Sequence, residues 1–184
     1  MTKRPGPKYL PGDPSPGEDI ERMIRVDHAG EYGAVRIYAG QTAVLRHRAA
    51  APVIREMAEQ EQAHLRRFDK LIADRHVRPT VLAPLWHVGG YLMGAGTAML
   101  GAPAAMACTV AVEEVIDAHY GRQADRLGDD DRELKGVIEE FQADEREHRD
   151  TALEHDARRA PAYPLLTAAV KAASRAAIWL SERF

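Results

Sequence analysis

The chain has 184 residues, of which 29% are charged, and a formal net charge of −3 at pH 7. This length is enough for one domain with a sizeable core, and the charge gives no electrostatic basis for binding nucleic acid. The single cysteine, Cys108, excludes an intramolecular disulfide and a cysteine-based metal cluster, and it favours a reducing compartment.

The first segment, residues 1–14, is rich in proline and glycine and contains three basic residues. It lacks the apolar core of a signal peptide, and it is too short and proline-broken for a typical transit peptide. We therefore expect a disordered lead-in, followed by one domain over residues 15–184. This interpretation favours a bacterial, cytoplasmic protein.

Helix-start and helix-stop patterns predict an all-α protein, and no segment has the pattern of a strand. Ser15, Pro16 and Glu18 predict a capped helix start, and that helix runs to about Arg48. Its glycines either allow a neighbouring helix to approach closely or are simply tolerated. These glycines are Gly30, Gly33 and Gly40. The other expected helices run from Pro52 to about Asp74, from about Pro103 to Leu127, from a cap at Asp129 or Asp130 to about Arg158, and onward from Pro164.

A long uncharged stretch, residues 79–112, lies between the second and fourth expected helices. Its length suggests a membrane span, but Pro84, Gly89–Gly90 and Pro103 interrupt it. We expect a helix or broken helix that rests in the lipid interface or covers an apolar cavity. The alternative is a hydrophobic helix packed in the core.

A sequence motif that ends in Glu-x-x-His occurs twice, at Glu61–His64 and at Glu145–His148, and a Val-Ile pair precedes each copy. Helix positions three apart share a face, so each Glu and His point the same way. A further Glu, at position 31 or 113, precedes each copy by about 30 residues. Each of these Glu residues has a Tyr seven residues on and a Gln ten residues on, and the two halves are offset by about 82 to 84 residues. The halves therefore form an internal repeat of two helical hairpins.

Two helices that each supply one Glu, and two that each supply Glu-x-x-His, form the ligand set of a carboxylate-bridged di-metal site in a four-helix bundle. Glutamates on helices usually lie in solvent, and two copies of Glu-x-x-His could occur by chance. The prediction of a metal site therefore depends on the longer repeat around them. Four buried carboxylates require cations, and two divalent ions balance them. Oxygen ligands with imidazole suit Fe(II) or Mn(II) better than zinc, and open coordination positions allow dioxygen to bind.

Other polar residues have two interpretations each. Asp27 and Asp117 either accept a hydrogen bond from a ligand imidazole or lie in solvent. We expect His28 and His119 to be ordinary packed or surface residues rather than ligands. We expect Tyr38 and Tyr120 to pack in the core, with proton or electron delivery as the alternative role.

The longest motifs are Arg25–Ala34, Arg36–Gln41, Arg78–Leu82, Gly94–Ala98, Ala107–Glu114 and Leu180–Arg183. They resemble those of the demethoxyubiquinone hydroxylase family, and the resemblance covers nearly all of the chain after about Ile20. The chain departs from that family in its short N-terminus, without a mitochondrial presequence, and at Asp117, where the family has a small residue. The second departure weakens Asp117 as a general partner of a ligand.

The resemblance implies a ferritin-like four-helix bundle with two additional helices, one of them hydrophobic and membrane-interacting. It implies a di-iron monooxygenase that uses dioxygen to hydroxylate the ring of a polyprenylated demethoxybenzoquinol, 3-demethoxyubiquinol, in ubiquinone biosynthesis. Electrons would come ultimately from NADH, with the quinone itself as a potential carrier. Tyr120 is an additional catalytic candidate. The implied ligands of the two irons are Glu31, Glu61, His64, Glu113 (rather than Glu114), Glu145 and His148.

The resemblance also implies a peripheral protein on the cytoplasmic face of the bacterial inner membrane. We expect a homo-oligomer and contacts with other ubiquinone-biosynthesis proteins, including a lipid-binding accessory protein. The alternatives are a ferritin-like iron oxidase or rubrerythrin-like peroxidase, and a non-enzymatic isoprenoid-binding bundle. The long uncharged stretch argues against the storage protein, and six convergent ligands argue against the carrier.

Overall fold

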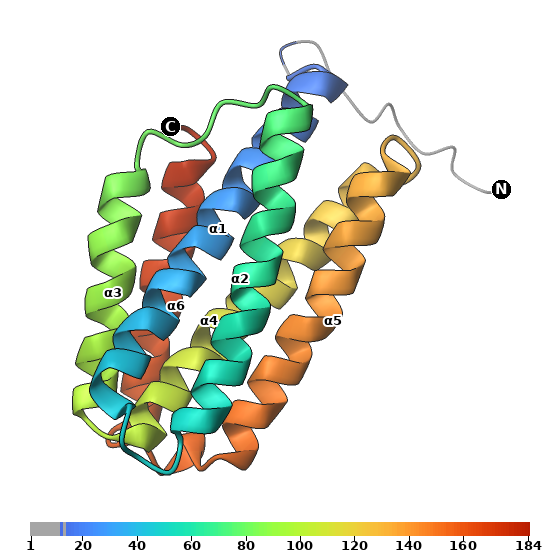
Figure 1. Cartoon of the computed structure of the whole chain (residues 1–184). Helices are drawn as coiled ribbons and strands as arrows, with labels where there is room; N and C mark the ends of the chain where they lie inside the picture. Colours follow the sequence, from blue (N-terminus) through green and yellow to red (C-terminus); the bar gives the residue numbers. More distant parts are fainter. Residues whose placement is uncertain (1–11, 13) are drawn as a thin grey trace, which may run out of the picture.

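The computed structural model describes residue 12 and residues 14–184, so the predicted lead-in, residues 1–14, lies almost wholly outside the described residues (Figure 1). The described part contains six α-helices and one short 3-10 helix, and no strand is found within it. The elements are α1 (Pro16–Leu45), α2 (Ala51–Asp74), α3 (Ala83–Met99), α4 (Ala102–Leu127), α5 (Arg132–Glu154), η1 (Ala157–Arg159) and α6 (Tyr163–Ser181).

Helices α1, α2, α4 and α5 form a four-helix bundle, in which α1 packs on α2 and α4 packs on α5. The remaining helices cover one side of this bundle, α3 against α1 and α6 against α4 (Figure 1). Helices α2 and α5 lie on the side away from α3 and α6. This arrangement confirms the predicted all-α bundle with two additional helices.

The N-terminus of α1 has the predicted capping box, in which the Ser15 hydroxyl accepts from the Glu18 amide and the Ser15 amide donates to the Glu18 carboxylate at 2.8 Å. The predicted cap of α5 at Asp129 or Asp130 is wrong. The cap is Asp131, whose carboxylate accepts from the Leu134 amide at 3.0 Å. The reason is that the two earlier residues are needed for the turn that follows Gly128, where φ is +56°.

The fifth helix ends at Glu154 rather than near Arg158. Asp156 adopts a left-handed backbone with φ of +64°, and the chain then forms the short η1 helix. An α-helix cannot continue through a left-handed residue, so the predicted C-terminus was four residues too late.

Two clusters of buried apolar side chains lie toward the opposite ends of the bundle. One contains Met57 and Met106, and the other contains Phe68, Ile138 and Phe141. Full burial of each such side chain contributes about 1.5–3 kcal/mol to folding. Because Met57 and Phe68 lie on α2 on either side of its Glu-x-x-His, the two clusters hold the bundle together around that motif.

The packing of α1 against α3 depends on glycine. A Cβ atom on Gly94 would lie 1.9 Å from the Ile37 carbonyl oxygen, and one on Gly40 would lie 2.3 Å from the Tyr91 carbonyl oxygen. Close helix approach, one of the two interpretations of the α1 glycines, is therefore confirmed at Gly40. A Cβ on Gly33 would meet no atom within 4 Å, because this residue lines a cavity.

Helix α3 is one continuous helix. The expected interruption of the uncharged stretch at Gly89–Gly90 is therefore absent from it. Pro84 lies in the first turn, where proline is compatible with a helix, and the break occurs at Gly101 with φ of +112°. Among the helices of residues 14–184, none combines the length and the apolar character required to cross a membrane.

Candidate metal centre

The six predicted ligands meet in the middle of the bundle, and all six are buried. They divide into two groups of four, and within each group one donor atom from every residue lies within 4.8 Å of the others. Glu61 and Glu145 belong to both groups. We name the groups position A, made by Glu31, Glu61, His64 and Glu145, and position B, made by Glu61, Glu113, Glu145 and His148.

Each ligand histidine directs Nδ1 into the cluster of carboxylates. Nδ1 of His64 lies 3.5 Å from an oxygen of Glu31 and 3.5 Å from an oxygen of Glu145. Nδ1 of His148 lies 2.9 Å from Glu61 and 3.5 Å from Glu145. The Nδ1 atoms are therefore the donor atoms available to a metal.

The outward Nε2 atoms of the two histidines have partners on the opposite helix. Nε2 of His64 on α2 lies 3.1 Å from Oδ2 of Asp144 on α5, and Nε2 of His148 on α5 lies 2.6 Å from Oε1 of Gln60 on α2. Neither partner was predicted. A signal for both was present, since each residue directly precedes the Glu of a Glu-x-x-His.

The suggested role of Asp27 and Asp117 as partners of a ligand imidazole is wrong. Asp27 accepts from Gln123 at 2.8 Å and lies 3.3 Å from His119, and its helix directs it toward α4. Asp117 accepts from Gln142 on α5 and from Arg146.

The two other histidines considered in the sequence, His28 and His119, belong to neither position A nor position B. His28 lies 3.0 Å from the exposed carboxylate of Asp69 on α2. His119 lies in the buried network with Asp27 and Gln123.

Two buried tyrosines contact the cluster across the repeat. The Tyr38 hydroxyl donates to Oε1 of Glu113 at 3.1 Å, and the Tyr120 hydroxyl donates to Oε1 of Glu31. Each tyrosine therefore binds the single Glu of the other half. In addition, the ring of Phe141 stacks on His64, with 3.9 Å between ring centroids.

Comparison with known proteins shows the family of the chain. The family described as "Ubiquinone biosynthesis protein COQ7" matches residues 18–181. The chain belongs to the COQ7 family. It is 59% identical over 175 residues to the 3-demethoxyubiquinol 3-hydroxylase of Rhodospirillum rubrum, which covers 95% of the chain and 82% of the relative.

Eukaryotic relatives are similar over almost the same region. The chain is 56% identical over 169 residues to the mitochondrial NADPH-dependent 3-demethoxyubiquinone 3-hydroxylase of Mus musculus, covering 90% of the chain and 78% of the relative. It is 43% identical over 181 residues to the mitochondrial 5-demethoxyubiquinone hydroxylase of Saccharomyces cerevisiae, covering 89% and 78% respectively.

The electrostatics of this COQ7-family centre are those of buried, interacting charges. Burial, together with the charges of Glu61 and Glu145, raises the pKa of Glu31 to about 8, and burial likewise raises the pKa values of Glu61 and Glu113. Burial would also raise the pKa of Glu145, but the adjacent imidazoles of His148 and His64 outweigh it and lower the pKa to about 2.

Burial lowers the pKa of an imidazole, but at this centre the adjacent carboxylates outweigh it. The pKa of His64 rises to about 11, chiefly through Glu145 and Glu31, and that of His148 rises to about 10, chiefly through Glu145 and Glu61. Without metal, the imidazoles therefore carry protons that offset the carboxylate charges.

The donor atoms of this COQ7-family chain fit bound metal. Within the described residues, eight buried atoms of the six side chains lack a hydrogen-bond partner, including both oxygens of Glu61 and Glu145 and Nδ1 of both histidines. Buried polar atoms are rarely left unpaired without a reason. Carboxylate oxygens together with imidazole nitrogens are a donor set that suits divalent metal ions. The cluster could therefore hold metal.

Proposed function

We propose that this COQ7-family chain is a di-iron monooxygenase that hydroxylates the ring of a polyprenylated demethoxybenzoquinol with dioxygen in ubiquinone biosynthesis. The observation that supports it most directly is the pair of four-residue groups that share Glu61 and Glu145. The bound irons would supply activation of dioxygen. One oxygen atom enters a ring C–H bond, and two electrons and two protons convert the other to water.

The electrons come from a reduced nicotinamide nucleotide in this proposal. The sequence resemblance suggested NADH, whereas the name of the mouse relative specifies NADPH. Either nucleotide supplies the required pair of electrons as hydride, and the quinone substrate can accept that pair and become a quinol. The roles of the chain's own residues do not depend on which nucleotide acts.

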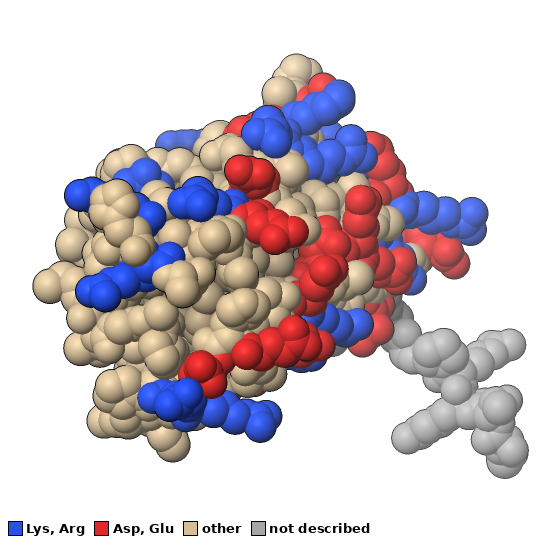
Figure 2. Space-filling view, turned by 60° about the horizontal axis from the view of Figure 1, so that its bottom comes forward, with Lys and Arg blue, Asp and Glu red and all other residues tan. Residues whose placement is uncertain are grey.

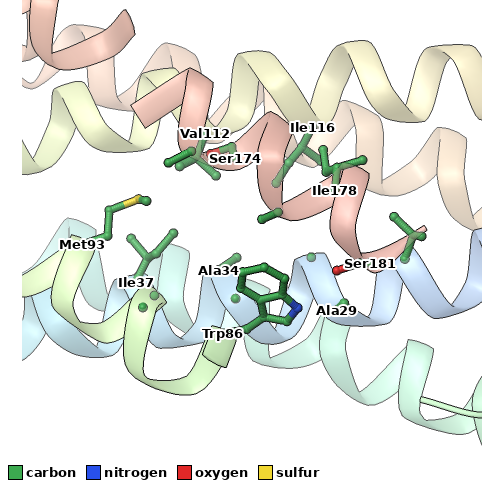
Figure 3. A pocket seen from close by; sticks show the side chains of 17 residues that line it. Ala29, Ala34, Ile37, Trp86, Met93, Val112, Ile116, Ser174, Ile178 and Ser181 are labelled. Carbon is green, nitrogen blue, oxygen red and sulfur yellow. The ribbon is translucent and has the colours of Figure 1, made fainter. Parts of the chain in front are cut away.

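An apolar cavity beside the centre supports a quinol substrate. Its volume is about 260 Å³, and its walls come from α1, α3, α4 and α6 (Figure 3). Its lining includes Gly30 and Val112, the residues that directly precede Glu31 and Glu113. The cavity therefore lies against α1 and α4, the two helices that supply the single glutamates.

One polar group in this cavity is available to a ligand. The indole nitrogen of Trp86 is buried and has no hydrogen-bond partner among the described residues, and the ring lies against the cavity (Figure 3). An unpaired buried donor is costly unless a ligand accepts its hydrogen bond. A quinol oxygen is an acceptor of the required type, whereas an iron-storage oxidase has no need of such a cavity.

The outer surface of α3 and α6 supports a position at a membrane. Leu85, Val88 and Leu92 on α3, and Leu165 and Trp179 on α6, are all exposed. Acidic side chains gather on the other side of the molecule (Figure 2). Exposed apolar clusters of this kind indicate a lipid or protein interface.

We place this surface on the cytoplasmic face of a bacterial inner membrane, as a peripheral contact. Helices α3 and α6 both line the cavity, so a quinol tail can enter between them from the lipid. A second copy of the chain, or a lipid-binding accessory protein of the same pathway, would bind beside this contact and cover the remaining apolar side chains.

The proposal predicts that metal and turnover are lost together. Replacing either Glu61 or Glu145 by alanine removes a ligand of both positions, so we expect less than one iron per chain and no detectable hydroxylation. Glu147→Ala is the control, because Glu147 is exposed on α5 and belongs to neither position. Iron content after anaerobic reconstitution and product formation from a demethoxybenzoquinol are the measurements. A Glu61→Ala protein with two irons and full turnover would disprove the assignment.

A further inference from the structure

Positions A and B have almost the same set of ligands. The internal repeat relates Glu31 to Glu113 and His64 to His148, and the two positions share Glu61 and Glu145. The hydrogen bonds to the single glutamates also match, since Tyr120 donates to Glu31 and Tyr38 donates to Glu113. Any difference between the two positions must therefore come from the residues around the ligands.

The partners of the ligand imidazoles differ in charge. At position A, Nε2 of His64 meets the carboxylate of Asp144, whereas at position B, Nε2 of His148 meets the amide oxygen of Gln60. Asp144 and Gln60 occupy the same place in the repeat, directly before the Glu of each Glu-x-x-His. The repeat is therefore broken here by one negative charge.

A second pair of matched residues breaks the repeat in the same direction. One turn before Glu31 stands Asp27, and one turn before Glu113 stands Thr109. Both are buried, and each accepts a hydrogen bond from a glutamine of the other half: Asp27 from Gln123 at 2.8 Å and Thr109 from Gln41 at 3.4 Å. Position A thus has a carboxyl group at both places where position B has a neutral side chain.

We propose that the two metal positions are unequal, with position A binding its ion more tightly than position B because Asp144 polarises His64. A carboxylate that accepts from the outer N–H of an imidazole increases the basicity of the inner nitrogen, and such partners typically change metal affinity by about 10- to 100-fold. An amide oxygen is a weaker acceptor than a carboxylate. The inference rests on the proposed two-metal function.

Asp144 is a positioning residue in this proposal, since it acts through His64 and does not itself touch the metal. Its side chain is 38% exposed, so solvent weakens its direct attraction for a cation and leaves the hydrogen bond as its main effect. Asp27 is fully buried, but its partners are His119 and Gln123, and it contacts neither ligand imidazole. We therefore expect Asp144 to contribute more to the difference than Asp27.

Titration of the metal-free full-length chain with Co(II), followed by calorimetry and visible absorption, tests the proposal. The wild-type chain should bind two ions with dissociation constants at least about tenfold apart. His148→Ala, which keeps position A, should retain the tight step, and His64→Ala should retain the weak one. Asp144→Asn should weaken the tight step by about tenfold, and Gln60→Glu should strengthen the weak step.

The matched control is Glu147→Gln, which removes a negative charge from the same helix without touching a ligand and should change neither step. Gln60 is exposed, so Gln60→Glu tests the proposal even where Asp144→Asn impairs folding. Two equal steps in the wild-type chain, or steps that neither variant moves, would overturn the inequality and leave the two-metal function standing. Binding of fewer than two Co(II) ions by the wild-type chain would overturn both.

Discussion

At the scale of single residues, the two buried tyrosines orient the single glutamates. Tyr38 and Tyr120 each donate a hydrogen bond to one oxygen of a glutamate, so the second oxygen of that glutamate remains for a metal. Burial and the neighbouring carboxylates raise the pKa of both phenols well above 10, so the phenols stay protonated and remain donors at neutral pH. Their primary role is therefore to fix the geometry of the centre.

Removing either hydroxyl should cost stability without removing metal. Tyr120→Phe and Tyr38→Phe each leave a buried carboxylate oxygen without a donor, which costs about 1–3 kcal/mol. We expect both variants to keep two ions, and the free energy of unfolding of the metal-loaded proteins to fall by similar amounts. Tyr163→Phe, on α6 away from the centre, is the control. Loss of stability in only one of the two variants would contradict the equivalence of the tyrosines.

The pKa values of the ligands predict how metal binding depends on pH. Those of Glu31, His64 and His148 are raised to about 8, 11 and 10, so the folded metal-free chain holds protons that a metal must displace. Because these values exceed those of an unfolded chain, the metal-free protein also loses stability as the pH rises toward 8. Glu145, whose pKa is lowered, acts only in the acidic range.

The stabilisation by metal should therefore increase with pH. We expect the difference in Tm between the Mn(II)-loaded and the chelator-treated protein to grow steadily from about pH 6 to about pH 8. Thermal unfolding at a fixed Mn(II) concentration across this range measures it. A difference that is constant, or that shrinks with rising pH, would mean that the ligands bind metal without releasing protons.

The cluster of six side chains was predictable from the sequence, whereas the partners of its two imidazoles were not. Spacing along one helix places Glu61 and His64 on a common face, and the repeat supplies the matching face on α5. Asp144 reaches His64 only because α2 and α5 lie side by side, and sequence spacing does not give the rotation of one helix against another. The same limit explains why contact with a ligand imidazole was one of two interpretations for Asp27, whereas its carboxylate faces Gln123 and His119 on α4.

At the scale of the helices, the α1–α3 contact has no tolerance for a side chain at its closest point. Gly94 is buried against the backbone of Ile37, and neither helix backbone can move aside independently of its neighbours. Gly96, two residues along the same helix, is exposed and has no neighbour within 4 Å of the position of a Cβ. Substitution of the two glycines by alanine should therefore change the stability of the protein in opposite directions.

We expect Gly94→Ala to lower the free energy of unfolding by about 1–3 kcal/mol, because the added methyl forces α3 away from α1. Gly96→Ala should instead raise it by about 0.5–1 kcal/mol, since alanine is the better helix former where nothing opposes it. Chemical denaturation of both variants measures the two signs. A neutral Gly94→Ala would show that α3 docks more loosely than the contact distances indicate.

At the scale of the whole molecule, the polar centre and the apolar surface lie on different layers. Helices α2 and α5 close the centre on the side where acidic residues gather, whereas α3 and α6, which contain no acidic residue, cover the opposite side (Figures 1 and 2). The cavity lies between the covering helices α3 and α6 and the bundle helices α1 and α4, on the side where we propose that the substrate enters. The uncharged composition of residues 79–112 was evident in the sequence, but the cavity was not, because residues of α1 and α6 complete it.

The last prediction concerns attachment to membranes. Leu92 and Met99 on α3 are 62% and 76% exposed, and Leu92→Glu with Met99→Glu places two charges where we propose lipid contact. Losing the burial of two such side chains, at about 1.5–3 kcal/mol each, should weaken binding to anionic vesicles by tenfold or more. Ala73→Glu with Ala143→Glu, on α2 and α5, adds the same charge on the other side and should leave binding nearly unchanged. Equal sedimentation of both variants with vesicles would refute contact through α3, whereas full retention of two irons would show that the centre is intact.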